Sequence, residues 1–201
     1  MGIRKQFNIL LVAGNGEGKT TWILEFILMY NEAHPEKRIL LGLPDDSESK
    51  FNSIPEIELD DLPCFVGIKK IIINGDEFYR EFQDYFSNKT NNFDGLFIND
   101  DPGAFIGRRP TSILAMFSRR RQLNVDFIWT FHGWNTTIPR GFFTFITSII
   151  MGKTSDNPEY TLKLLPEDKQ VQFMKHYNEI NELYDKGIKY QFRELPLKGL
   201  Y

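Results

Sequence analysis

Three glycines, each separated from the next by one residue, come just before a lysine and two adjacent threonines near the start of this 201-residue sequence. Glycine tolerates the curled backbone that points successive N–H groups at phosphate oxygens, and a helix that begins there adds partial positive charge. In such a loop Lys19 reaches the β- and γ-phosphates, and the Thr20 hydroxyl binds magnesium. The pattern therefore predicts binding of ATP or a close relative together with Mg²⁺. The predicted nucleotide-binding residues are Gly14, Asn15, Gly16, Glu17, Gly18, Lys19, Thr20 and Thr21.

The segments that flank this glycine-rich loop are those that a phosphate-binding loop needs. The apolar run 7–13 before it is typical of a buried strand, and the residues after it have helical spacing. One position departs from the usual pattern, because Ala13 stands where the first glycine is expected. Alanine adds only a methyl group, so the departure matters only if the backbone there needs a positive φ. The alternative is a glycine-rich turn that carries Lys-Thr by chance.

Asp100 and Asp101 directly follow the strand-like run 94–99. Parallel sheets gather ligands at the carboxyl ends of their strands, where the glycine-rich loop is also expected. We predict that Asp100 holds magnesium through its water shell, and that Asp101 acts as a base or orients the attacking water. Both carboxylates can stay ionised beside a cation. The alternative is a plain turn, because Asp-Asp-Pro-Gly is also common at bends.

Apolar runs alternate with segments of helical period along the chain. This alternation predicts an α/β fold in which a mostly parallel central sheet carries helices on both faces. The predicted strands are 7–13, 38–43, 69–74, 94–99, 125–131, 144–151 and 189–195. The predicted helices are 20–31, 76–86, 110–122 and 169–184, and the polar stretch 45–63 is expected to form a loop. No repeat, low-complexity tract or linker interrupts the pattern, so residues 1–201 are expected to form a single domain.

The composition is that of a globular protein, with 41% hydrophobic and 25% charged residues. The formal net charge of −3 predicts no general attraction to nucleic acid, so any such contact must use a local basic patch. The single cysteine, Cys64, excludes an internal disulfide framework and favours a reducing compartment. No apolar run is long enough to cross a bilayer and no signal peptide is recognised, so a cytoplasmic location is expected.

The stretch 113–153, taken with the glycine-rich loop, resembles the core of the FtsK–HerA superfamily of DNA-pumping ATPases. That superfamily includes the genome-packaging ATPases of membrane-containing viruses. The order of features is similar: an acidic strand end, a helix ending in arginines, a strand ending in the polar triplet 130–132, a loop at 135–140 and a strand at 145–152. The resemblance covers roughly residues 7–155. It implies a RecA-like fold of the ASCE class of P-loop NTPases.

Two positions depart from the pattern of that superfamily. Many members carry Glu after the magnesium-binding Asp, where this chain has the shorter Asp101, and many carry Gln in the polar triplet, where it has Phe131. The resemblance therefore assigns the γ-phosphate sensor to Thr130 or His132, and the choice between them stays open at this point. His132 could instead be an ordinary core or surface histidine.

The resemblance also implies a homo-oligomeric ring, in which one subunit supplies an arginine finger to its neighbour's nucleotide. The candidates are Arg119, Arg120 and Arg121, with Arg121 preferred by its distance from the following strand. The alternative is a helix end whose cations complement the helix dipole. Arg108 and Arg109 are candidates for contacts with DNA phosphates in the pore of the ring, or else belong to a solvated loop.

The leading hypothesis is a motor ATPase that hydrolyses ATP to translocate DNA. A viral genome-packaging ATPase is favoured, because the chain is compact and no membrane anchor or accessory domain is predicted. The expected partners are double-stranded DNA, further copies of the chain, and a capsid or membrane vertex protein. Three alternatives stay open: an assembly ATPase like those that extrude filamentous phages, a small nucleotide or metabolite kinase, and a nucleotide-dependent scaffold that does not hydrolyse.

Overall fold

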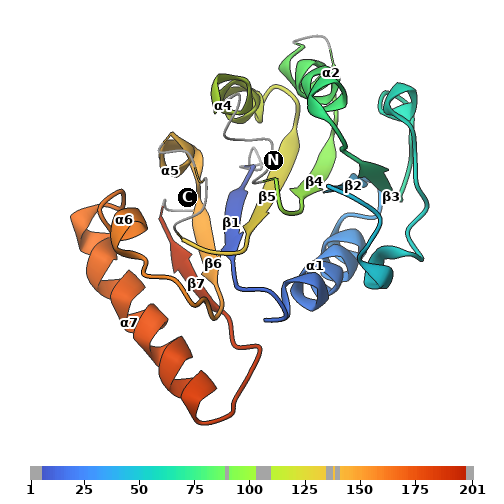
Figure 1. Ribbon diagram of the computed structural model, residues 1–201. Coiled ribbons are helices and arrows are strands. Elements are labelled where there is room, and N and C mark those ends of the chain that lie inside the picture. Colours follow the sequence, from blue (N-terminus) through green and yellow to red (C-terminus); the bar gives the residue numbers. More distant parts are fainter. Residues whose placement is uncertain (1–5, 89–90, 103–109, 135–137, 139–140, 198–201) are drawn as a thin grey trace.

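The computed structural model describes residues 6–88, 91–102, 110–134, 138 and 141–197. Its strands are β1 (Asn8–Val12), β2 (Arg38–Leu43), β3 (Ile68–Ile72), β4 (Gly95–Asn99), β5 (Val125–Phe131), β6 (Ser148–Met151) and β7 (Arg193–Pro196). They form one seven-stranded sheet in the order β3-β2-β4-β5-β1-β6-β7 (Figure 1). Strands β1 to β6 are parallel, and β7 pairs antiparallel with β6. The predicted mostly parallel sheet is confirmed.

The central strands β1 and β5 are buried along their whole length. Their side chains alternate between two apolar cores, so that neighbours such as Leu10 and Leu11 belong to different cores. A strand covered on both faces appears in the sequence as a continuous apolar run. This explains why both strands could be predicted from the sequence.

Helices cover both faces of the sheet, as the sequence predicted (Figure 1). Helix α1 (Lys19–Ala33) and the short 3₁₀ turn η1 (Ser49–Phe51) pack on one face. The other face carries α2 (Asp76–Ser87), α4 (Pro110–Arg119), α5 (Phe142–Phe145), α6 (Glu159–Leu162) and α7 (Glu167–Asp185), and a second 3₁₀ turn, η2 (Leu59–Asp61), lies beside it. Among the described residues, no helix combines the length and the apolar character that crossing a membrane requires.

The order of the strands brings three chain segments to one edge of the sheet. Strand β5 lies between β1 and β4, with Val12 opposite Phe131 and Asn99 opposite Trp129. The loop after β1, the carboxylates after β4 and the polar end of β5 therefore follow neighbouring strand ends. The backbone of Asp100 adds β2 to this group, because its N–H donates to the Gly42 carbonyl at 2.9 Å.

Three predicted elements differ from the structure by more than two residues at one end. The strand predicted at 144–151 begins only at Ser148, because residues 142–145 form α5 and the Phe142 ring packs edge-on against Phe117. Aromatic residues favour strands, and here packing overrides that preference. Helix α4 ends at Arg119 and not at 122, since the chain turns through a left-handed Asn124 (φ 50°) to enter β5. The last strand starts at Arg193 and not at 189.

Candidate nucleotide-binding site

The glycine-rich loop joins β1 directly to α1, as a phosphate-binding loop requires. Gly16 and Gly18 adopt positive φ values of 74° and 87°, which glycine alone reaches without strain. Ala13 is not among the described residues with positive φ, so its methyl group does not strain the backbone. A Cβ atom on Gly152, which directly follows the neighbouring strand β6, would lie 2.8 Å from the Ala13 Cβ. The glycine at 152 therefore makes room for the alanine at 13.

The Lys19 ammonium group lies against the loop that precedes it. Its Nζ donates to the carbonyls of Ala13 at 2.6 Å and Gly14 at 3.1 Å, and lies 2.7 Å from His132 Nδ1. Burial lowers the pKa of Lys19, and the nearby carboxylates, Asp100 first among them, oppose that shift. The ammonium group is thus held at the floor of the loop, within reach of a phosphate that enters it.

Thr130 connects the two carboxylates that follow β4. Its hydroxyl donates to Asp100 Oδ1 and accepts the backbone N–H of Asp101 at 3.1 Å. Burial raises the pKa of Asp100, while the hydrogen bond from Thr130 and the charge of Lys19 oppose the rise. The Thr130 side chain is fully buried, so its position fixes where the Asp100 carboxylate points.

Asp101 and His132 form a second pair at this edge. The Asp101 carboxylate accepts from His132 Nε2 at 3.0 Å, and the backbone of Asp101 is left-handed with φ 44°. Because His132 Nδ1 faces the Lys19 ammonium, the imidazole accepts there and carries its hydrogen on Nε2. His132 therefore links the Lys19 ammonium to the Asp101 carboxylate.

Two residues that sequence reasoning missed reach the loop from the segment after β2. Glu48 Oε2 accepts from the Thr20 hydroxyl at 3.2 Å, and Lys50 Nζ donates to the Thr21 hydroxyl at 3.1 Å. Both lie in the polar stretch 45–63, which was expected to be a loop. The available signal was topological, since a strand next to the acidic strand must also end at this edge of the sheet.

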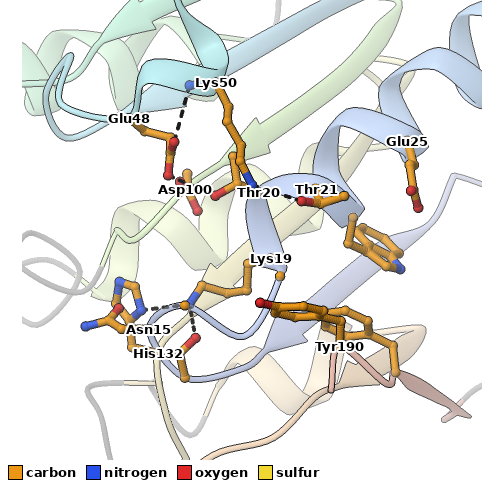
Figure 2. A pocket seen from close by; sticks show the side chains of 15 residues that line it. Asn15, Lys19, Thr20, Thr21, Glu25, Glu48, Lys50, Asp100, His132 and Tyr190 are labelled. Atoms are coloured by element: carbon orange, nitrogen blue, oxygen red, sulfur yellow. Dashed lines mark hydrogen bonds between the residues drawn. The ribbon is translucent and has the colours of Figure 1, made fainter. Parts of the chain in front are cut away.

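A cavity of about 590 Å³ runs along the loop and the first turns of α1. In Figure 2, Glu48, Asp100 and His132 lie on one side of Lys19, and Tyr190 and Glu25 lie on the other. We call the first side the phosphate end, and the side lined by Trp22, Tyr190 and Phe192 the aromatic end. The full lining is Gly14, Asn15, Gly16, Gly18, Lys19, Thr20, Thr21, Trp22, Glu25, Glu48, Lys50, Asp100, His132, Tyr190 and Phe192. Asp101 and Thr130 are not part of this lining: Thr130 is fully buried, and the Asp101 side chain is 41% exposed.

The donors at the phosphate end suit magnesium. The Thr20 hydroxyl and the carboxylates of Asp100 and Glu48 are oxygen ligands, which Mg²⁺ prefers. The described residues contain no group of three or more His, Cys, Asp or Glu side chains that could enclose a metal ion. That finding agrees with the usual binding of Mg²⁺, which keeps several waters and takes further ligands from substrate phosphates.

The candidate arginine fingers lie at the opposite edge of the sheet. Arg119 is the last residue of α4, and Arg120 and Arg121 belong to the turn that enters the amino end of β5. The seven residues of β5 separate them from the cavity by about 20 Å. These arginines therefore do not reach the cavity of their own chain. Arg108 and Arg109 lie outside the described residues.

No protein-family model matches this sequence, and no curated protein is similar to it in sequence. Solved structures do match its fold. The genome packaging NTPase B204 from Sulfolobus turreted icosahedral virus 2, in complex with AMPPCP, gives a TM-score of 0.67 over 98% of this chain and 95% of that chain, at 13% identity. Its complex with ATP-gammaS gives 0.64 over 98% and 94%, at 15% identity. B204, the DNA-packaging ATPase from Sulfolobus turreted icosahedral virus, gives 0.64 over 98% and 100%, at 10% identity.

These matches establish the fold along nearly the whole chain. It is the α/β fold of P-loop NTPases, and the predicted resemblance to genome-packaging ATPases is confirmed at that level. Two of the matched structures contain nucleotide analogues, AMPPCP and ATP-gammaS.

Proposed function

We propose that this chain hydrolyses ATP with magnesium and uses the hydrolysis to translocate DNA during the packaging of a viral genome. The observation that carries the proposal is the convergence of Lys19, Thr20 and Asp100 on one cavity at the carboxyl ends of β1 and β4. A lysine, a hydroxyl and a carboxylate around a glycine-rich loop are the parts that a P-loop ATPase needs. The likeness of fold to packaging NTPases supports the coupling to DNA.

The loop and Lys19 bind the triphosphate. Backbone N–H groups of residues 15, 16 and 18 face the phosphates, since those of Gly14 and Glu17 donate to backbone carbonyls. Lys19 exchanges its contacts with the Ala13 and Gly14 carbonyls for phosphate oxygens. The Thr20 hydroxyl and Asp100 would hold the magnesium, which would supply positive charge to offset that of the triphosphate. Because the Lys19 ammonium already lies at the floor of the loop, it has little distance to travel.

Two carboxylates compete for the task of orienting the attacking water. Asp101 is the candidate from the sequence, but it is not among the residues that line the cavity, and its carboxylate contacts His132. Glu48 lines the cavity and contacts the Thr20 hydroxyl. A residue that orients water must lie within hydrogen-bond reach of that water. We therefore assign the water to Glu48 and give Asp101 a positioning role through His132.

His132 is the better candidate for the γ-phosphate sensor. Thr130 is fully buried, and its hydroxyl is engaged by Asp100 and by the Asp101 backbone. His132 lines the cavity and contacts Lys19, which must rearrange when the γ-phosphate enters. Thr130 then orients Asp100, while His132 transmits the presence of the phosphate to Asp101.

An oligomeric ring would explain why the candidate arginine fingers lie far from the cavity of their own chain. An arginine finger acts in trans, so its distance from the cavity of its own chain is no obstacle. We propose that Arg121, which is exposed, or its neighbour Arg120 completes the site of an adjacent copy. The same proposal includes DNA contact by Arg108 and Arg109, docking on a capsid or membrane vertex protein, and a single domain over residues 1–201.

The placement of these arginines also bears on the kinase alternative. A small kinase closes an arginine-bearing lid over its own nucleotide. Arg119, Arg120 and Arg121 lie at the wrong edge of the sheet for that movement. The phage-type assembly ATPase shares the motor core, and the response to DNA separates it from a packaging motor.

The test is steady-state ATP hydrolysis with and without long double-stranded DNA, repeated over a series of salt concentrations. We expect DNA to stimulate turnover and the stimulation to fade as salt rises, because contacts with phosphates release counterions. Lys19→Ala is the matched negative control for contaminating ATPases. Turnover that ignores DNA at every salt concentration would contradict translocation and favour an assembly ATPase or a kinase.

A further inference from the structure

The aromatic end of the cavity is built from two distant parts of the chain. Trp22 lies in the first turns of α1, directly after the phosphate-binding threonines, whereas Tyr190 and Phe192 lie between α7 and β7. None of the three side chains has a role in holding phosphate or magnesium. The question is why the chain returns here to place rings beside the glycine-rich loop.

Tyr190 does not contribute to the core. Its side chain is 61% exposed, so it buries little apolar surface. Its backbone is left-handed with φ 59°, a conformation that is costly for a bulky residue. The ring lies directly on Gly18, because a Cβ atom added there would be 3.0 Å from Tyr190 Cδ1. An exposed ring held at some cost against a phosphate-binding loop points to contact with a ligand.

Trp22 presents a second ring at this end of the cavity. It stacks on Phe26 with a centroid distance of 5.1 Å and an interplanar angle of 21°, and it lies 6.5 Å from the Phe192 ring. These contacts fix the indole while leaving it on the cavity wall. Trp22 is therefore preorganised for a planar partner and needs little reordering to bind one.

The direction of the bound triphosphate follows from the phosphate end. Lys19 and Asp100 select the β- and γ-phosphates, so the α-phosphate lies toward Thr21 and the rest of the nucleotide continues past it. Glu25 and Tyr190 lie on that side of the cavity in Figure 2, and Trp22, which follows Thr21 in α1, also lines it. The base and sugar thus leave the loop at the aromatic end.

We propose that Trp22, Tyr190 and Phe192 form a stacking subsite for the base of the nucleotide. This inference rests on the proposed binding of a nucleoside triphosphate by the glycine-rich loop. Stacking of a base on an aromatic side chain strengthens binding about tenfold or more in other proteins, and it does not require hydrogen bonds to the base edge. The subsite therefore adds affinity for a nucleotide over bare polyphosphate.

The test compares ATP with inorganic tripolyphosphate, which has the phosphates without base or sugar. Titration calorimetry on the full chain with Mg²⁺ gives both dissociation constants for wild type, Tyr190→Ala, Tyr190→Phe and Tyr160→Ala. Tyr160 is an exposed tyrosine of α6 outside the cavity lining, which makes its variant the matched control. We expect Tyr190→Ala to weaken ATP binding about tenfold and tripolyphosphate binding less than twofold. Tyr190→Phe and Tyr160→Ala should bind both ligands as wild type does.

Intrinsic fluorescence supplies a second readout. Of the three tryptophans, Trp129 and Trp134 are fully buried, and Trp22 lines the cavity. ATP should quench the emission, tripolyphosphate should not, and Trp22→Phe should lose the response. Equal weakening of both ligands by Tyr190→Ala, or no weakening of either, would overturn the base subsite. Wild-type protein that binds neither ligand would instead overturn the nucleotide-binding assignment itself.

Discussion

The two ends of the cavity are built in different ways. The phosphate end takes most of its lining from one short stretch of sequence and from the ends of adjacent strands. The aromatic end joins Trp22 to Tyr190, residues far apart in the chain. Phosphates need backbone N–H groups and fixed charges, which local sequence dictates. A base needs only flat apolar surface, which many side chains can supply from any direction.

The two ends also differ in electrostatics. At the phosphate end Lys19 is buried and Asp100 nearly so, and burial moves the pKa of each toward its neutral form. Tyr190 at the aromatic end is exposed. Without a ligand, the buried charges of Lys19 and Asp100 are therefore unfavourable. The described residues of the aromatic end include no buried charge, so its contribution to affinity carries no such electrostatic cost. Ligand binding at the phosphate end should depend on individual charged or polar atoms. Binding at the aromatic end should depend on the area of aromatic surface.

The largest effect is expected from Lys19→Ala. Removing the ammonium deletes the main charge that meets the β- and γ-phosphates, so ATP and tripolyphosphate should both bind at least about a hundredfold more weakly. Calorimetry with both ligands measures this change, and circular dichroism verifies the fold. Unchanged affinity for ATP would refute the assignment of the loop. A loss of affinity for ATP but not for tripolyphosphate would mean that Lys19 lies at the aromatic end and does not contact the phosphates.

The next effect separates the two carboxylates of the phosphate end. Glu48→Gln should lower kcat by about a hundredfold while the dissociation constant for ATP changes by less than about threefold, because the amide no longer accepts a proton from water. Asp101→Asn should lower kcat by about tenfold, since it acts through His132. Single-turnover hydrolysis and ATP binding should be measured on both variants. If Asp101→Asn is the more damaging, the water belongs to Asp101, as the sequence first suggested.

The contrast between the two ends explains what the sequence could predict. The glycine-rich loop, Lys19, Thr20 and Asp100 could be predicted as neighbours in space because each lies in a contiguous motif or at the end of a buried apolar run. Glu48 and Tyr190 could not, because their places depend on how the segments after β2 and α7 fold back. Neither segment carries a periodic pattern that fixes its path.

The elements of the fold likewise divide into those that the sequence predicted and those that it did not. Strands β1, β4 and β5 are buried on both faces, so their apolar runs predicted them. The helix α5 was missed because Phe142 and Phe145 favour strands locally, while packing on Phe117 decides their conformation. The local sequence pattern thus predicts the strands that are buried on both faces of the sheet. It fails where one tertiary contact decides whether a segment becomes a helix or a strand.

The smallest expected effect concerns the stability of the phosphate end without ligand. Burial raises the pKa of Asp100 in the folded state above its value in the unfolded chain. The folded protein then binds more protons between those two pKa values, so the free energy of unfolding falls as pH rises through that interval. At neutral pH the buried carboxylate is destabilising, and Asp100→Asn should raise the melting temperature by a few degrees. Asparagine still accepts the hydrogen bond from Thr130, so the local packing is kept.

The sign of this effect can be checked by thermal unfolding from about pH 4 to pH 8 in the presence of EDTA. The advantage of Asp100→Asn should be greatest at the alkaline end and shrink as the pH falls below the raised pKa of Asp100, where the wild-type carboxyl group becomes protonated as well. Asp45→Asn is the matched control, because Asp45 is an exposed aspartate whose pKa is lowered by its hydrogen bonds to Ser47. An advantage independent of pH, or a loss of stability at neutral pH, would mean that the attraction of Asp100 to Lys19 outweighs the cost of its burial. The buried charges of the phosphate end would then not be held at a net cost, and the two ends would not differ in electrostatics in this way.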